Sequence, residues 1–268
     1  MFSSYSSILE SIKKDDVEEF HSKITPDFNF ESEFDLPPDL IPDILKEGAR
    51  WIHFIVHSGA VNIANSVLPR VNTEIVDDNQ RALIHFAAAS NNFEMFKLIE
   101  TITPTRNIPD AYNNSIACYS VFSIEILEYL WMTGYEFNLK EITYAAQLQA
   151  CDGFNFIFNI LYEEFGHENE SVFFIPLKII KWQVAHKIYQ HVTEKGLDLT
   201  HLKDPSGKTP LLHYFVSNND FRMVKELIPF INDFDVRDEF GWTAYEIAVN
   251  KSFKNVIKVF DDFENKKK

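Results

Sequence analysis

Cysteine is almost absent from this sequence, and its two cysteines are far apart. Cys118 and Cys151 are the only ones among 268 residues, and they form no C-x-x-C pair. A disulfide framework and a thiolate zinc site of the usual spacing are therefore excluded. The pair fits a reducing compartment, where a cysteine packs as a small apolar residue.

Long apolar runs and an export signal are also missing. The longest apolar stretches, residues 154–162 and 172–177, are much shorter than the roughly 20 residues that a membrane span needs. The N-terminus, Met-Phe-Ser-Ser-Tyr-Ser-Ser, has neither a basic start nor an apolar core, so it does not resemble a secretory signal. We therefore expect a cytoplasmic protein that does not insert into a membrane.

Basic residues are in deficit. The chain holds 40 acidic and 25 basic residues, for a net charge of −15. A field of that sign repels phosphate backbones, so nucleic acid is not an expected partner. Residues 1–47 hold twelve Asp and Glu against four Lys and supply −8 of the total. A Lys-rich stretch from Lys178 to Lys208 is either a set of solvated helix faces or a functional patch.

What the sequence does contain is a stretch that recurs. Residues 77–99 combine a tight turn, a short helical pattern, a sharp reversal and a second helical pattern. Residues 238–260 repeat this layout, and residues 204–225 open a third copy. Self-similarity near this period is typical of arrays in which each unit is one helix-turn-helix element. The period follows from His53 and His85, which are 32 residues apart.

Weaker copies fill the rest of the chain. One lies upstream around residues 48–68, and three more lie between Asp110 and Lys203, which makes about seven units. Apolar residues at three- and four-residue spacing predict second helices over residues 124–130, 156–162 and 184–189. The sixth copy carries one extra residue, which we assign to Leu212.

The copies resemble the ankyrin repeat, in particular the divergent, protist-type ankyrin arrays. The resemblance rests on the segments Gly207-Lys208-Thr209-Pro210-Leu211, Ile84-His85-Phe86-Ala87-Ala88, and Gly241-Trp242-Thr243-Ala244 with Ala248. The chain departs from the family where Arg81-Ala82-Leu83 replaces the Thr-Pro pair. The resemblance implies an all-α solenoid of stacked helix-turn-helix units, joined by short hairpin turns, over residues 45–264.

Local chemistry gives the recurring residues structural roles. Asp110, Asp204 and Asp238 stand at turn entries, where a carboxylate caps backbone donors. Threonine at a helix start caps an N–H group, and Pro210 suits the first helical position. The recurring histidine is expected to pack on the core and to hydrogen-bond the adjoining turn.

The N-terminal region predicts a separate cap. Residues 1–44 combine a helix pair, around residues 7–12 and 17–24, with an acidic, proline-containing loop. The loop carries Phe28, Phe30 and Phe34 in positions that look exposed, and it is either a linker or a segment that folds over the array. Residues 265–268 are expected to form a basic, solvated tail.

The candidate motifs for catalysis and for cofactor binding are incomplete. The segment Gly207-Lys208-Thr209 lacks the earlier glycine of a phosphate-binding loop, because that position is Leu202. His53 and His57 are spaced like two metal ligands, yet no third ligand has a suitable spacing. No nucleophile, acid or base is singled out. We therefore expect no enzyme, no cofactor and no metal.

The sequence predicts a protein-binding scaffold or adaptor, in monomeric form, whose partner it does not identify. Binding would use the concave face and the turn tips, where the copies differ. The candidate residues are Asp78, Asn79, Arg81, Tyr112, Asn114, Ser206, Lys208, Glu239, Phe240 and Trp242 in the turns, and His57, Ser90 and Lys251 at the first helices. Phe240 and Trp242 are either binding anchors or packing under the last hairpin. The alternative is a regulatory or inhibitory subunit whose acidic N-terminal segment masks or mimics a ligand.

Overall fold

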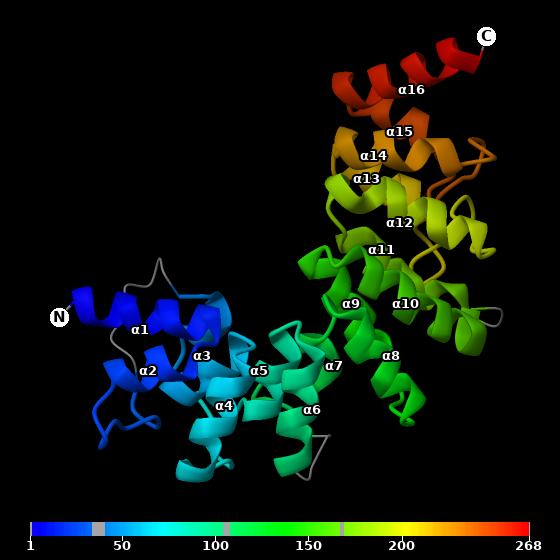
Figure 1. Cartoon of the computed structure of the whole chain (residues 1–268). Helices are drawn as coiled ribbons and strands as arrows, with labels where there is room; N and C mark the ends of the chain where they lie inside the picture. Colours follow the sequence, from blue (N-terminus) through cyan, green and yellow to red (C-terminus); the bar gives the residue numbers. More distant parts are fainter. Residues whose placement is uncertain (1, 34–40, 104–107, 167–168, 268) are drawn as a thin grey trace. The chain divides into compact units, whose positions relative to one another are not determined.

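The chain forms two compact helical units, and each is described here by itself. In this computed structural model the described residues are 2–33, 41–103, 108–166 and 169–267. Unit 1 is Met1–Tyr135 and unit 2 is Glu136–Lys268. Within the described ranges the chain holds helices, turns and four isolated bridges, with no β-strand (Figure 1). The prediction of an all-α fold is confirmed.

Unit 1 contains an N-terminal helix pair followed by three further pairs. Its elements are α1 (Phe2–Lys14), α2 (Val17–Lys23), the 3-10 turn η2 (Asp43–Leu45), α3 (Trp51–His57), α4 (Val61–Val67), η3 (Leu68–Arg70), α5 (Leu83–Ala89), α6 (Phe93–Ile102), α7 (Ile116–Tyr119) and α8 (Ile124–Met132). The first helices α3, α5 and α7 pack side by side, and so do the second helices α4, α6 and α8.

Unit 2 contains four pairs. Its elements are α9 (Leu139–Leu148), α10 (Cys151–Leu161), η4 (Tyr162–Gly166), η5 (Glu170–Phe173), α11 (Phe174–Ile179), α12 (Trp182–Glu194), α13 (Leu211–Ser217), α14 (Phe221–Leu227), η6 (Ile228–Phe230), α15 (Ala244–Asn250) and α16 (Lys254–Lys267). Helix α10 begins five residues before its predicted start. Helix α16 continues to Lys267, so the expected tail of residues 265–268 is helical up to that residue.

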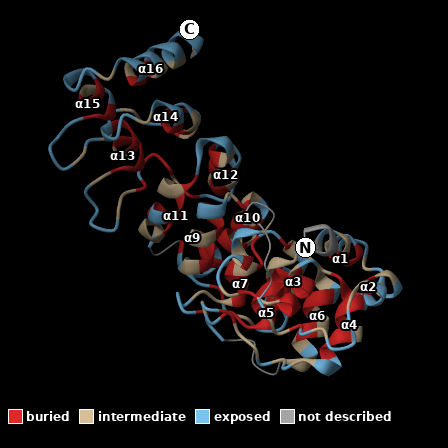
Figure 2. Ribbon diagram, turned by 90° about the vertical axis from the view of Figure 1, so that its left-hand side faces the viewer, coloured by how far each residue is buried: buried red, intermediate tan, exposed pale blue. Residues whose placement is uncertain are grey.

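The buried residues lie along the helices of each unit (Figure 2). In α5 the whole run from Leu83 to Ala88 is buried, because neighbours cover this first helix on several sides. In α6 only Met95, Phe96 and Ile99 are buried, which is the single stripe that the three- and four-residue spacing predicts. Stacking of neighbouring pairs thus supplies the core that one pair alone could not form.

Each of four turns is held by one aspartate. The carboxylate of Asp77 accepts hydrogen bonds from the N–H groups of Asn79 and Arg81, at 3.0 and 2.8 Å. The carboxylates of Asp110, Asp204 and Asp238 accept backbone N–H bonds in the same way. The third residue after each aspartate has positive φ, and these residues are Gln80, Asn113, Gly207 and Gly241. The predicted capping role of Asp110, Asp204 and Asp238 is confirmed, and Asp77 has the same role.

The extra residue of the sixth copy lies in its turn. The N–H group of Asp204 bonds to the carbonyl oxygen of Thr209, five residues on, whereas that of Asp238 bonds to Trp242, four residues on. The assignment of the insertion to Leu212 was therefore wrong. A turn absorbs one residue more easily than a helix start, where a shift would rotate every following side chain.

The helix starts differ in how they are capped. Thr243 caps α15 as expected, since its Oγ1 accepts a hydrogen bond from the N–H group of Glu246 at 3.2 Å. Pro210 precedes α13 instead of occupying its first position, and α13 has no side-chain cap. The predicted placement of proline inside the helix was wrong by one residue.

The histidine positions carry both of their expected roles. His53 and His85 are the third residues of α3 and α5, and each Nδ1 accepts a hydrogen bond at 3.0 Å from the backbone N–H group that precedes its helix. His213 is the third residue of α13, and its Nε2 lies 3.0 Å from the carbonyl oxygen of Trp242 in the adjoining turn. All three rings are buried. The metal interpretation of His53 and His57 is not needed to explain either residue.

Residues 26–33 lie against the first repeat of unit 1. Phe30 is buried, and the N–H group of Trp51 donates to the carbonyl oxygen of Ser32 at 3.2 Å. Phe28 is half-buried, with its ring 5.5 Å from that of Trp51. The expectation that both phenylalanines are exposed was wrong, because this segment folds onto α3. Phe34 and the two prolines that follow it lie outside the described residues.

Asp15 ties the N-terminal helix pair to the first repeat. It lies between α1 and α2 with φ of 53°, and its carboxylate accepts hydrogen bonds from the N–H groups of Asn62 and Ile63, both at 2.9 Å. Helix α4 receives no side-chain cap from its own Ala60. Asp15 therefore caps the start of α4 from the neighbouring helix pair.

Replacing Asp15 with alanine should lower the free energy of unfolding of unit 1 by about 1–2 kcal/mol, the range for the loss of a helix cap. Urea unfolding followed by circular dichroism measures the change. The matched variant Asp15→Asn keeps an acceptor oxygen and tolerates positive φ, so it should lose less than half as much. Wild-type stability of Asp15→Ala would show that the cap contributes nothing.

Candidate protein-interaction surface

The candidates at the last turn of unit 2 come together around one pocket. This pocket has a volume of about 250 Å³. It is lined by Ser217, Asp238, Phe240, Trp242, Ile247, Asn250 and Lys251. Phe240 is 76% exposed and Trp242 is 44% exposed, so neither ring is packed under the hairpin. The turn thus presents two aromatic side chains beside the end of a first helix.

An ion pair connects the preceding turn of unit 2, which Asp204 caps, to this last turn. The Nζ atom of Lys208 lies 3.1 Å from Oε2 of Glu239, and both side chains are largely accessible. Ser206 is exposed, and its hydroxyl donates to the carboxylate of Asp204 at 2.9 Å. An ion pair this exposed adds little stability, so Lys208 and Glu239 can exchange it for a partner's charges.

Two candidates of unit 1 are exposed at turn tips. Tyr112 is 65% exposed at the tip of the turn that Asp110 caps. Asp78 is exposed in the preceding turn, where its carboxyl group lies against Gly48. A Cβ atom at Gly48 would lie 2.2 Å from Cγ of Asp78, and the φ of Gly48 is +66°. The positive φ favours glycine at this position, and the carboxyl group of Asp78 occupies the space that a side chain would fill.

Arg81 was predicted at the binding surface, and the structure contradicts this. Its side chain is 8% exposed, and its Nη2 lies 2.5 Å from Oδ2 of Asp77, whose side chain is fully buried. The guanidinium also lies 5.6 Å from the centre of the Phe86 ring. Burial acts to lower the pKa of Arg81, but the contact with Asp77 raises it overall. Arg81 is thus the buried counterion of Asp77, the aspartate that holds this turn.

Asn79 and Asn114 hold turns together. The backbone carbonyl of Asn79 accepts a hydrogen bond from the N–H group of Ala111 in the next turn, at 2.8 Å, and its side chain donates to Glu47. The side chain of Asn114 donates to Oδ2 of Asp110 at 2.9 Å. Burial acts to raise the pKa of Asp110, but hydrogen bonds from Tyr119 and Asn114 lower it overall. Polar groups of both asparagines are thus already hydrogen-bonded within the turns, so fewer of these groups can bind a partner.

The first-helix candidates His57 and Ser90 are half-buried. The hydroxyl of Ser90 donates to the carbonyl oxygen of Ala87 at 2.7 Å and accepts from the N–H group of Asn92 at 3.2 Å. Burial lowers the pKa of His57, so the ring is neutral at neutral pH. Lys251, in contrast, is exposed and lines the pocket of unit 2.

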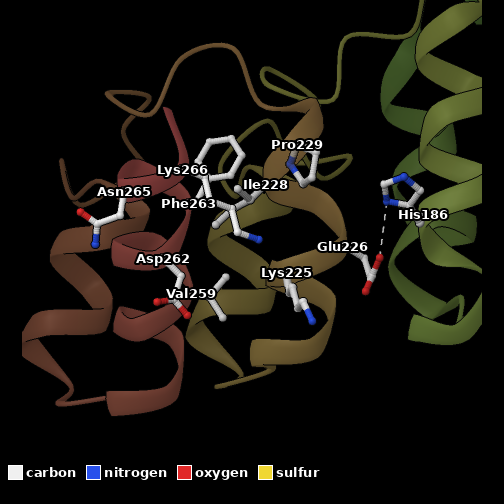
Figure 3. A pocket seen from close by; sticks show the side chains of 10 residues that line it. All are labelled: His186, Lys225, Glu226, Ile228, Pro229, Val259, Asp262, Phe263, Asn265 and Lys266. Carbon is white, nitrogen blue, oxygen red and sulfur yellow. Dashed lines mark ion pairs between the residues drawn. The ribbon is translucent and has the colours of Figure 1, made fainter. Parts of the chain in front are cut away.

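A larger groove, which sequence reasoning missed, lies on the second-helix side of unit 2 (Figure 3). It measures about 710 Å³, and its lining residues are His186, Lys225, Glu226, Ile228, Pro229, Val259, Asp262, Phe263, Asn265 and Lys266. It forms where α14 ends at Leu227 while α16 continues beside it. The spacing of Val259 and Phe263, one helical turn apart, was the available signal.

The acidic N-terminal segment is engaged within unit 1. Glu31 accepts a hydrogen bond from the N–H group of Asn72 at 2.8 Å. The carboxylate of Glu47 accepts a hydrogen bond from the side chain of Asn79, and its Oε2 lies 4.0 Å from Nη2 of Arg81. These contacts, like the cap that Asp15 provides, use acidic groups to attach the segment to the array. They favour a cap over a mimic of a ligand.

The Lys-rich stretch is not one patch. Lys178 lies over the rings of Phe174 and Tyr214, at 5.7 and 5.2 Å from their centres, and Lys208 pairs with Glu239. Lys181, Lys187 and Lys195 are exposed along α12 and its ends. Three or more potential metal ligands are nowhere grouped within the described part of the chain. Among the described helices, none is both long and apolar enough to cross a bilayer.

Comparison with known proteins supports the fold. No family model and no curated protein matches the sequence. Among solved structures, the chain is similar to the crystal structure of the human ASB11 ankyrin repeat domain, with a TM-score of 0.57 and 14% sequence identity. The match covers 78% of this chain and 96% of that chain. Together with the repeated turns and helix pairs, this likeness shows that the chain is a divergent protein of the ankyrin-repeat fold.

Proposed function

We propose that the chain is a non-enzymatic scaffold or adaptor that binds another protein through its turn tips and first helices. The observation that carries this proposal is the pocket of unit 2, where Phe240, Trp242 and Lys251 meet. Stacked repeats are built to offer such an extended surface, and aromatic side chains are the commonest anchors in protein interfaces.

The rigidity of the turn favours binding. The carboxylate of Asp238 accepts hydrogen bonds from the N–H groups of Phe240 and Trp242 themselves, at 3.0 and 2.9 Å. The N–H group of Gly241 bonds to the carbonyl oxygen of Asp238 at 3.1 Å. Both aromatic residues are therefore held at the backbone before any partner arrives, which lowers the entropy lost on binding.

Replacing Phe240 and Trp242 with alanine should weaken partner binding at least about tenfold, since anchor residues dominate interface energies. Helix content should not change, because both side chains are exposed. The measurement is capture of partners from cell extract with wild-type and variant protein, followed by titration of the captured partner. Tyr112→Ala in unit 1 is the comparison variant, because it removes an exposed aromatic from another turn tip. The control is Phe122→Ala, which removes an exposed aromatic residue that is not a candidate.

Three outcomes distinguish a wrong site from a wrong function. If the double variant binds as tightly as the wild type and Tyr112→Ala binds more weakly, the anchor lies in unit 1. If neither substitution changes binding, the turn tips do not form the surface. Failure to capture any protein in a specific manner would contradict the scaffold function itself.

A further inference from the structure

The last helix pair of unit 2 leaves its stacking face uncovered. In α3, α5 and α13, the second and sixth residues of the helix are buried, with the next first helix packed alongside. These residues are Ile52 and Val56 in α3, Ile84 and Ala88 in α5, and Leu212 and Val216 in α13. The corresponding residues of α15 are Tyr245, which is 41% exposed, and Val249, which is 49% exposed.

Helix α15 is otherwise like α3, α5 and α13. Its first and fifth residues, Ala244 and Ala248, are fully buried, and α15 packs against α13 as α5 packs against α3. The exposure is therefore confined to the side on which another helix pair would stack. Tyr245 and Val249 are one helical turn apart and form a single apolar strip on that side.

Helix α16 contributes a charged margin to the same face. Lys254, Ile257, Asp261 and Glu264 are spaced by three, four and three residues, which places them on one side of the helix. The groove-lining residues Val259, Asp262, Phe263 and Lys266 lie on the opposite side, toward α14 (Figure 3). Ile257 is half-buried, while the three charged residues of the stripe are exposed.

The order of these charges indicates what kind of molecule packs on this face. The stripe is basic at its N-terminal end, at Lys254, and acidic at its C-terminal end, at Asp261 and Glu264. A twofold axis perpendicular to α16 places this helix antiparallel to its counterpart in a second copy, and such an isologous contact pairs one surface with itself. The basic end of each helix then faces the acidic end of the other. The surface is self-complementary in this arrangement and in no parallel one.

We propose that a second copy of the chain packs on this face, with α15 and α16 of unit 2 forming a twofold interface. Tyr245 and Val249 form its apolar centre, and Lys254 pairs with Glu264 of the other copy at each end. This departs from the monomer expected from sequence. It does not depend on the proposed function, because the turn tips and the pocket beside Phe240 are not part of the stripe.

The oligomeric state tests the proposal. Sedimentation equilibrium of the full chain over the micromolar range should show a monomer–dimer equilibrium. The double variant Tyr245→Glu with Val249→Glu should shift dissociation at least about tenfold toward monomer, because it buries like charges at the centre. The control is Phe122→Glu with Met132→Glu, which makes the same change at exposed residues of unit 1 and should leave association unchanged. A wild-type monomer at every concentration would overturn the proposal.

A charge exchange tests the antiparallel geometry. Lys254→Glu and Glu264→Lys should each weaken association, because each places like charges opposite one another. The variant that carries both changes should restore association toward the wild-type level, since the charge order is only reversed. The two residues are ten positions apart on α16, so an effect within one chain does not produce this rescue. Absence of rescue, with helix content retained, would overturn the twofold arrangement.

Discussion

The variant Arg81→Ala should lose about 3 kcal/mol of unfolding free energy in unit 1, the lower end of the cost of breaking a buried ion pair. The substitution leaves the carboxylate of Asp77 buried without its counterion. Two backbone N–H groups still bond that carboxylate, which keeps the loss near the low end. Because total stabilities are typically about 5–15 kcal/mol, this is a large fraction. Urea unfolding, with hydrogen exchange of α5 and α7, measures it.

The chain contains a matched control for this change. Lys208 is likewise the fourth residue after a turn aspartate, but its partner Glu239 is accessible and the pair is exposed. Lys208→Ala should therefore change stability by less than about 0.5 kcal/mol. Arg81→Lys keeps the charge but loses the forked contact, so it should fall between the two. Equal effects of Arg81→Ala and Lys208→Ala would show that burial of Arg81 is not what stabilises the turn.

The repeated turns and helix pairs could be predicted because their signals are local. An aspartate that caps its own turn needs only the next few backbone N–H groups, as at Asp238. The second-helix stripe of Met95, Phe96 and Ile99 follows from helical spacing alone. Such signals survive in this divergent chain even where Thr-Pro is replaced. The fold was therefore accessible from residues a few positions apart.

What could not be predicted depends on contacts between distant residues. Arg81 at a turn tip looks like a surface cation until the burial of Asp77 beside it is known. Phe30 in an acidic loop looks exposed until the segment is seen to pair with the start of α3. The groove of unit 2 needs the length of α16 relative to α14, which no short motif encodes. The predicted binding residues therefore differ from the structure more than the predicted fold does.

The buried histidines link stability to pH. Burial lowers the pKa of His53 from its ordinary 6.5 to about 4, and it also lowers the pKa values of His85 and His213. Geometry gives the same result, because Nδ1 of His53 already accepts a hydrogen bond from the N–H group of Arg50. A proton on Nδ1 would remove that acceptor and place two donors face to face.

The sign of the effect follows from which state binds the proton. Between about pH 6.5 and pH 4, the unfolded chain protonates His53 while the folded chain does not, so stability falls as pH falls. Over that window, the shift of His53 alone corresponds to about 3 kcal/mol. Below pH 4 both states are protonated, and this contribution stops changing.

His53→Gln should therefore be less stable than the wild type at pH 7.5, and the gap should shrink by about 3 kcal/mol toward pH 4. Glutamine can still offer an oxygen to the N–H group of Arg50, as Glu246 does for Thr243 in α15. Urea unfolding at several pH values measures the slope. The control Ile55→Val lowers the stability of the same helix by about 1 kcal/mol without removing a titrating group, so it should keep the wild-type slope. A wild-type slope in His53→Gln would mean that other groups, the carboxylates first among them, cause the acid sensitivity.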